Sequence, residues 1–345
     1  MKAQRSLITV GVTTFERTEL LIETISSILS QTYQDFNILI SNDNPNRKLN
    51  KSEFEILQNP KIRIINQIDN LGEIENLNWL LNQCSSEYFT WLADDDLMHP
   101  EFLKILVSKM LNSPTSSVVY SNYAHGLVPD LFFSNLDKQT EFRNYSACEF
   151  LEIYSCRKIH LVGCYGLFRT EIIKKIGGFK KLGSGFSPGS DTLIPVLMSA
   201  ITDIDYVDIP LVFLRTHPHS ISTSSPDLLS YFSAETDFMD EVAKISLNFP
   251  TPIRKRIFFG FLSWFTENHL TVVKRSSDIN AIFISWTFLK AEWRSMRNFR
   301  RLKVGTLIEL KHFFFTIKIL IVDLIQKYLY PKLKPIFNFF FREKV

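Results

Sequence analysis

Three consecutive aspartates, Asp94, Asp95 and Asp96, constrain this chain more than any other feature of its sequence. They follow residues 87–93, an aromatic and branched run that predicts a buried strand. They precede residues 100–111, which predict a helix with a proline in its first turn. Adjacent carboxylates at the end of an apolar strand repel one another, so they are costly unless a cation neutralises them. The cation that carboxylate oxygens favour is a hard divalent ion, Mg²⁺ or Mn²⁺.

The triplet also fits a second interpretation, a solvated acidic turn that caps the following helix, and the surrounding pattern decides between the two. Strands and helices alternate through the first 125 residues. The strands are predicted at residues 7–14, 36–41, 61–66, 88–93 and 117–121, and the helices at 18–31, 72–84 and 100–111. This rhythm predicts an α/β fold in which helices flank a mostly parallel, Rossmann-like sheet.

Polar or acidic residues stand at the ends of three predicted strands. These ends are Thr13 with Thr14, Asp43, and the aspartate triplet. Ligands of open α/β sheets bind outside the carboxyl ends of the strands, so we expect the three ends to converge on one crevice. This convergence favours a binding site over a surface turn.

The segment after residue 125 is less regular. Residues 126–160 show little pattern, whereas 163–168 predict a strand and 207–214 a late strand. Glycines and a proline crowd residues 180–189, which predicts a mobile loop ahead of an apolar helix that ends near residue 200. We therefore expect one domain over residues 1–225, with a regular part (1–125) and a less regular part (126–225).

The charge of the chain is divided unevenly along its length. The net charge is +3, but residues 251–345 hold 18 Lys and Arg against 6 Asp and Glu, which leaves −9 for residues 1–250. Phenylalanine clusters accompany this basic region, and no stretch reaches the ~20 uncharged apolar residues of a spanning helix. We expect residues 226–345 to form a helical tail that lies on an anionic membrane surface. The alternative is a soluble helical domain that joins copies into a homo-oligomer.

The four cysteines are Cys84, Cys148, Cys156 and Cys164, and none forms a CxxC pair. Neither a zinc site nor a disulfide framework is therefore predicted, and a reduced, cytoplasmic chain is the simplest account. The first residues contain no apolar signal-peptide core, so we expect no secretion.

Several short motifs in order make the chain resemble family 2 glycosyltransferases of GT-A fold over residues 6–223. The motifs lie at residues 8–17, 27–33, 40–44, 70–72, 92–100, 177–179, 190–191 and 215–217. Each motif is weak alone, and their order makes the resemblance strong. It implies an enzyme that takes a sugar from a nucleotide-sugar donor. It also implies that residues 1–225 are the catalytic domain, with a nucleotide-binding part (1–125) and an acceptor part (126–225).

The resemblance implies roles for donor-side residues. Thr13 and Phe15 match the first strand end, which meets the nucleobase, and Asp43 matches the residue that receives the imide N–H of the base. Asn70 and Gly72 match the turn that closes over the nucleotide.

The resemblance also implies a DXD-type metal site for Mn²⁺ or Mg²⁺. Asp95 matches the principal metal carboxylate, and Asp94 the residue that often touches ribose. Ala93 stands where many members carry another aspartate, so the division of metal ligation among the three aspartates, Asp96 included, stays open. His217 matches a late histidine that reaches back to the metal in some members, and the alternative is an exposed turn histidine before Pro218.

Asp191 resembles the catalytic base of the family, although many members carry Glu-Asp where this chain has Ser190-Asp191. An acceptor hydroxyl must lose its proton as it attacks, so a carboxylate is needed on the face opposite the leaving diphosphate. The alternative is that Asp191 is only the N-cap of the following helix.

The predicted function is an inverting glycosyltransferase for cell-surface polysaccharide biosynthesis. Its acceptor would be a glycan or lipid-linked glycan, and it would act as a peripheral protein at the inner face of the cell membrane. We expect no nucleic-acid partner. Two alternatives are a catalytically silent binding or scaffold subunit and a nucleotidyltransferase, which usually has a glycine-rich loop after its first strand; here Gly11 lies within that strand.

Overall fold

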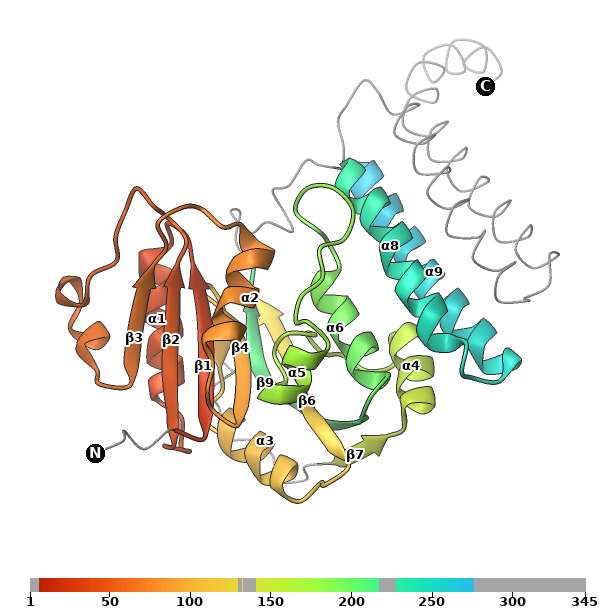
Figure 1. Ribbon diagram of the computed structural model, residues 1–345, viewed down its shortest axis with the longest axis horizontal. Helices are drawn as coiled ribbons and strands as arrows, with labels where there is room; N and C mark the ends of the chain where they lie inside the picture. The colour runs from red at the N-terminus through yellow and green to blue at the C-terminus, as the bar shows by residue number, and fades with distance from the viewer. Residues whose placement is uncertain (1–5, 130–131, 133–140, 217–227, 276–345) are drawn as a thin grey trace, which may run out of the picture. The chain divides into compact units, whose positions relative to one another are not determined.

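The computed structural model describes residues 6–129, 132, 141–216 and 228–275 (Figure 1). The chain divides into two compact units, one of residues 1–181 with 188–225 and one of residues 182–187 with 226–345. His217 and the tail beyond residue 275, with the Phe-Phe-Phe runs at 313–315 and 339–341, lie outside the described residues.

The first unit is built on a mixed sheet, and its described strands run in the order β3-β2-β1-β4-β8-β6-β9-β5, with β7 paired to β9. The strands are β1 (Ile8–Thr14), β2 (Phe36–Asn42), β3 (Ile62–Asn66), β4 (Tyr88–Ala93), β5 (Leu97–Met98), β6 (Ser116–Gly126), β7 (Phe142–Tyr145), β8 (Leu167–Arg169) and β9 (Asp203–Arg215). The predicted α/β class, with a GT-A type sheet flanked by helices, is confirmed.

The four strands β3, β2, β1 and β4 are mutually parallel. Their registers pair Thr14 with Asn42, and Thr13 with Ala93. Because parallel strands present their carboxyl ends at one edge, this register brings the end of β1, Asp43 and the aspartate triplet to the same edge of the sheet.

The other half of the sheet contains the antiparallel pairs. β8 lies between β4 and β6 and runs antiparallel to both, and the long β9 runs parallel to β6 but antiparallel to β5 and β7. The predicted strand over 163–168 is therefore only partly right, because β8 begins at Leu167. β5 and β7 carry too few residues for a period-2 pattern to reveal them.

Helices flank the sheet and contribute the apolar side chains that bury it. They are α1 (Thr18–Leu29), α2 (Glu73–Gln83), α3 (Phe102–Leu111), α4 (Ala147–Ser155), α5 (Thr170–Lys175) and α6 (Ser190–Ser199), with 3-10 turns at Lys51–Glu53 and Glu55–Gln58. The N-cap of α1 is Arg17, and Thr18 is the first helical residue, as the predicted range 18–31 implies. Trp91, at the centre of the core, makes edge-on contacts with Phe89, Phe168 and Phe179.

The second unit contains two long helices side by side, α8 (Leu228–Ser246) and α9 (Thr251–Arg275) (Figure 1). The Phe238 ring of α8 packs edge-on against the Phe261 and Phe265 rings of α9, with centroids 5.2 and 4.8 Å apart. Part of the aromatic run predicted for the membrane surface is therefore core of this unit. Among the described residues, no helix is long and apolar enough to cross a lipid bilayer.

The glycine-rich loop predicted to be mobile makes hydrogen bonds with α8. The Gly183 N–H donates to the Asp237 carboxylate at 2.7 Å, and the Ser184 N–H donates to the Ser233 hydroxyl at 3.1 Å. These bonds satisfy two backbone N–H groups of the loop, and its mobility stays a prediction.

Candidate active site

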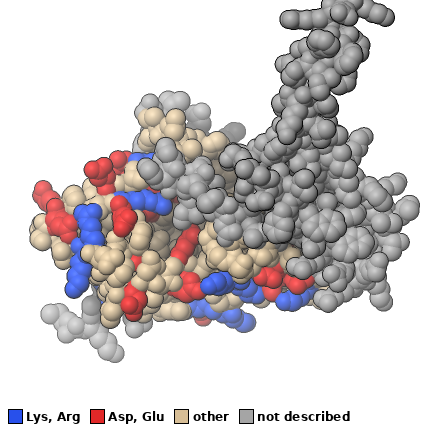
Figure 2. Space-filling view, turned by 90° about the horizontal axis from the view of Figure 1, so that it is seen from above, with Lys and Arg blue, Asp and Glu red and all other residues tan. Residues whose placement is uncertain are grey.

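A cleft of about 1270 Å³ opens at the carboxyl edge of the parallel strands. Every predicted site residue that the structure describes lines it. These residues are Thr13, Phe15, Asp43, Asn70, Gly72, Asp94, Asp95, Asp96 and Asp191. On the face in Figure 2, acidic and basic side chains of the described residues are interspersed. The cleft lining, in contrast, holds eight acidic residues and three arginines.

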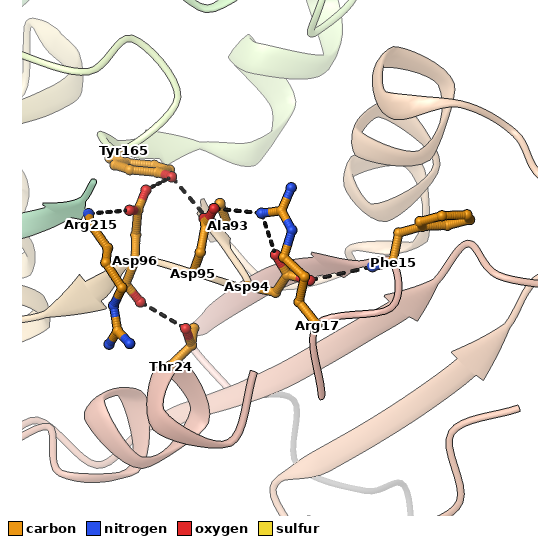
Figure 3. A network of polar contacts seen from close by, with 9 residues as sticks. All are labelled: Phe15, Arg17, Thr24, Ala93, Asp94, Asp95, Asp96, Tyr165 and Arg215. Carbon is orange, nitrogen blue, oxygen red and sulfur yellow. Dashed lines mark hydrogen bonds and ion pairs between the residues drawn. The ribbon is translucent and has the colours of Figure 1, made fainter. Parts of the chain in front are cut away.

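Asp94 ties the triplet to the loop after β1 (Figure 3). Its carboxylate accepts the Phe15 N–H at 3.3 Å and one N–H of the Arg17 guanidinium at 3.3 Å. Burial raises the pKa of the Asp94 carboxyl to about 6, although the Thr14 hydroxyl and Arg17 oppose this rise. Asp94 therefore orders the loop that carries Phe15 and Arg17.

Asp95 faces the same guanidinium from the other side. Nη1 of Arg17 lies 2.5 Å from Oδ2 of Asp95, so one nitrogen contacts two carboxylates (Figure 3). The Asp95 side chain is 13% exposed and lines the cleft. A positive group thus already occupies the point where Asp94 and Asp95 converge.

Asp96 points toward the protein framework and is held there from two elements. The Tyr165 hydroxyl donates to one oxygen of its carboxylate, and the Arg215 backbone N–H donates to the other at 2.9 Å. Its backbone carbonyl accepts the Thr24 hydroxyl of α1 at 2.8 Å. Burial, and after it the charge of Asp95, raises the pKa of the Asp96 carboxyl. Asp96 thereby anchors the triplet to α1, to β9 and to the segment before β8.

Asp43 organises the turn that leads into α2. Its two carboxylate oxygens accept the Leu71 N–H at 2.8 Å and the Gly72 N–H at 3.0 Å. The Asn70 side-chain oxygen also accepts the Gly72 N–H, at 2.8 Å. Gly72 has a φ of +85°, a conformation that side-chain-bearing residues rarely adopt. Three of the predicted donor-side residues, Asp43, Asn70 and Gly72, thus belong to one hydrogen-bonded turn.

Asp191 lies in the first turn of α6 and lines the cleft. The N-cap of this helix is Gly189, so the alternative that Asp191 is the cap is wrong. Burial raises the pKa of the Asp191 carboxyl, while hydrogen bonds from Thr192 oppose the rise. The backbone of Asp191 packs directly on Gly163, where a β-carbon would lie 2.7 Å from the Asp191 carbonyl carbon and closer still to its oxygen.

Glu73, the first residue of α2, is a further carboxylate in the cleft. Part of its side chain is open to solvent, but the cleft walls and the charges of Asp191 and Asp95 raise its pKa to about 7. The charge of Arg17 opposes this shift. Glu73 therefore belongs to the same electrostatic cluster as the triplet and Asp191.

A comparison with known protein families accounts for this arrangement. The family described as glycosyl transferase family 2 matches residues 9–177, which hold the parallel strands, the triplet and the Asp43 turn. The chain is a family 2 glycosyl transferase over these residues.

Two relatives of this family 2 glycosyl transferase match it over about a third of their own length. An uncharacterised glycosyltransferase of Haemophilus influenzae is 33% identical over 104 residues, which are 30% of this chain and 32% of that protein. The GalNAc(5)-diNAcBac-PP-undecaprenol beta-1,3-glucosyltransferase of Campylobacter jejuni is 37% identical over 105 residues, 30% of this chain and 34% of that protein.

Solved structures share the fold of this glycosyl transferase at low identity. Residues 1–349 of S. aureus TarS align with a TM-score of 0.61 and 14% identity, covering 86% of this chain and 87% of that one. The same TarS fragment in complex with UDP aligns with a TM-score of 0.59 and 12% identity, covering 86% of this chain and 87% of that one.

The sequence did not single out four residues that shape the site of this glycosyl transferase: Arg17, Glu73, Gly163 and Tyr165. Arg17 stands within a quoted motif, yet nothing in the motif shows that its guanidinium reaches the triplet. Glu73 directly follows the predicted turn glycine, and its position at a helix start was the signal available. Gly163 and Tyr165 lie in the segment between α4 and β8. Only the fold brings Tyr165 to the triplet and Gly163 to Asp191.

The fit of a divalent cation can be judged from the donors in this glycosyl transferase. Among the residues described, no group of three or more His, Cys, Asp or Glu side chains is arranged to hold a metal ion. The donors are nevertheless carboxylate oxygens, the kind that Mg²⁺ and Mn²⁺ prefer. The Arg17 guanidinium pairs with both Asp94 and Asp95, so this part of the triplet attracts positive charge. The triplet therefore suits a divalent cation both in its charge and in its oxygen ligands.

Proposed function

We propose that this chain transfers a sugar, with inversion, from a nucleoside-diphosphate sugar to a hydroxyl of a glycan precursor. The observation that carries the proposal is the single cleft that collects the triplet, the Asp43 turn and Asp191. The volume of about 1270 Å³ is sufficient for a nucleotide-sugar and part of an acceptor.

The donor would lie along the carboxyl edge of the parallel strands. Phe15 supports this placement because the residue is 43% exposed and lines the cleft, where its ring would offer an apolar surface to a nucleobase. Thr13 and Asp43 would bind the base, Asn70 and Gly72 would cover the nucleotide, and Asp94 would contact ribose. These five donor contacts are proposals that follow the family pattern.

Asp191 would remove the proton of the attacking hydroxyl. It lies in the cleft that also contains the triplet, and its raised pKa brings it nearer the range in which a carboxylate is an effective base at neutral pH. Attack from the side opposite the diphosphate inverts the sugar configuration. Gly163 contributes by allowing the α6 backbone to approach closely enough to hold Asp191 in the cleft.

Asp95, with Asp96 and His217, would hold a divalent cation. When bound, such an ion stabilises the negative charge that develops on the leaving diphosphate. Asp96 already accepts two hydrogen bonds from the chain, so its share would be small while Asp95 provides the principal oxygen. His217 belongs to the proposal on the family pattern alone.

The acceptor would be a lipid-linked glycan, met at the cytoplasmic face of the cell membrane. The name of the C. jejuni relative describes an undecaprenol-linked acceptor for that protein, and the positive balance of residues 251–345 favours an anionic surface for this one. A homo-oligomer formed through the C-terminal region remains the alternative use of the tail.

Two competing functions have weaker support. A nucleotidyltransferase would use a glycine-rich phosphate loop after β1, but Gly11 lies within β1, where a β-carbon would be 2.7 Å from the Phe89 ring. A catalytically silent subunit would have no need of Asp191 in the cleft beside the triplet.

A thermal-shift screen tests donor binding. UDP, GDP, dTDP, ADP and CDP are each added with Mn²⁺ or with EDTA, because a ligand that binds only the folded state raises the melting temperature. We expect one of them to raise it, and more strongly with Mn²⁺. No shift with any nucleotide under either condition would contradict the proposal.

A further inference from the structure

The Arg17 guanidinium lies where two carboxylates of the triplet converge. Its Nη1 is 3.3 Å from Asp94 and 2.5 Å from Asp95 (Figure 3). The side chain is only 25% exposed, so both ion pairs are partly shielded from water. A cation bound to Asp95 from the cleft would meet this positive charge.

The Arg17 backbone is fixed, so only its side chain is available to move. Its carbonyl accepts the Leu21 N–H at 2.9 Å as the N-cap position of α1. The preceding Glu16 has a φ of +62°, a conformation uncommon outside glycine, and its carboxylate accepts the Asn44 side-chain amide at 3.0 Å. A strained backbone held at a site indicates that the position of the next side chain matters.

The cleft as a whole is strongly acidic. Eight acidic residues line it, against the three arginines Arg17, Arg47 and Arg215. Arg47 pairs with Glu53 at 3.7 Å and Arg215 with Glu23 at 2.6 Å, whereas Arg17 pairs with the triplet. A dianionic or trianionic diphosphate entering such a cleft needs positive charge, and a planar guanidinium matches phosphate oxygens well.

We propose that Arg17 is the resident counter-cation of the triplet: it competes with the divalent cation for Asp95 until the donor diphosphate offers its guanidinium another anionic partner. This inference rests on the proposed function. It adds that, in the ligand-free protein, the Arg17 guanidinium neutralises the carboxylates in the absence of metal. The cation and the diphosphate then bind together because each removes an obstacle to the other.

The proposal predicts a specific pattern of coupling. Binding of the nucleoside diphosphate and of the cation must strengthen each other by the same factor, since linkage is reciprocal. Without the guanidinium, the cation has no competitor in the free protein, so Mn²⁺ alone should bind more tightly. The diphosphate then no longer has to draw the guanidinium away from Asp95. The factor by which it strengthens Mn²⁺ binding should therefore fall.

Manganese binding to the full-length chain tests this without any transfer reaction. Free Mn²⁺ is counted by electron paramagnetic resonance, with and without the nucleoside diphosphate that gives the largest thermal shift. We expect Arg17→Gln to tighten Mn²⁺ binding to the nucleotide-free protein by about fivefold or more, and to reduce the coupling factor similarly.

Two further variants control the experiment. Arg47 lines the same cleft but pairs with Glu53, outside the triplet. Arg47→Gln therefore measures the general effect of removing a positive charge, which should be smaller than the effect of Arg17→Gln. Arg17→Lys keeps the charge and should retain most of the competition. Circular-dichroism melts establish that each variant is folded.

The outcomes separate the inference from the function on which it rests. Unchanged Mn²⁺ affinity and coupling in Arg17→Gln, or equal effects in Arg47→Gln, would overturn the inference while nucleotide binding by the wild type leaves the function standing. Nucleotide binding with no Mn²⁺ bound to either protein would also overturn it. Failure of the wild type to bind any nucleoside diphosphate would refute the proposed function, and the inference with it.

Discussion

Gly163 and Asp191 are in direct backbone contact, although 28 positions separate their numbers. A β-carbon on Gly163 would overlap the Asp191 carbonyl and would lie 2.7 Å from Cδ of Pro195. Neither neighbour is the flexible end of a side chain, so α6 itself would have to move. The position of the proposed base is therefore set by a residue that bears no functional group.

Gly163→Ala should lower stability and turnover together. We expect a loss of about 1–3 kcal/mol in the free energy of unfolding, as for other overpacked sites, measured by urea denaturation. Displacement of Asp191 should also lower kcat more than KM for the donor. Gly126→Ala is the matched control, because there the new β-carbon would lie 3.6 Å from the Phe213 ring, an ordinary contact. Equal effects of the two variants would argue against a positioning role for Gly163.

Asp191→Asn should lower turnover by ~10²-fold or more while donor affinity is retained, because an amide does not accept a proton at neutral pH. The loss of a carboxylate from the first turn of α6 should change stability by only about 0.3–1 kcal/mol. Kinetics and thermal melts of the same variant separate the two effects. Turnover close to that of the wild type would show that another group is the base.

Glu73 gives the folded protein a pH dependence of known sign. Its pKa rises from 4.5 to about 7 on folding, so the folded state holds this proton more tightly than the unfolded state. The resulting stability is fully present below about pH 4.5 and is lost as the pH rises through about 7. The free energy of unfolding of Glu73→Gln relative to that of the wild type should therefore increase from pH 5 to pH 8.

Thermal melts in EDTA at these two pH values measure that gain for Glu73. Glu75→Gln removes an exposed carboxylate from the same helix and serves as the control for loss of surface charge. A difference in melting temperature between Glu73→Gln and the wild type that is the same at pH 5 and pH 8 would contradict the raised pKa.

The parallel half of the fold and its polar edge could be predicted from sequence, because β1, β2 and β4 are buried runs that end in polar residues. The register of parallel strands then required Asp43 and the triplet to meet. In the antiparallel half, β6, β8 and β9 were predicted in part, whereas β5 and β7 could not be predicted, since β5 has two residues and β7 has four. Tyr165 reaches Asp96 only because β8 inserts between β4 and β6, a non-local pairing with no signal in the local pattern.

Binding of the C-terminal tail to an anionic membrane stays a prediction. The Phe238, Phe261 and Phe265 rings pack within the second unit, so they are not all available to a membrane. The basic balance of residues 251–345 still predicts that the full chain sediments with anionic liposomes at low salt and is released at high salt. Neutral liposomes are the control. A chain that ignores anionic liposomes but sediments as an oligomer would favour the assembly role of the tail.

Consumption of nucleotide-sugars tests the central claim most directly. The full-length protein is incubated with Mn²⁺, a panel of nucleoside-diphosphate sugars and a bacterial lipid extract as the source of acceptor, and release of the nucleoside diphosphate is measured. The account predicts release from one donor that depends on the extract and is lost by ~10²-fold or more in Asp191→Asn. Binding of a nucleoside diphosphate without consumption of any donor above the enzyme-free rate would contradict it, and would identify the chain as a silent binding subunit.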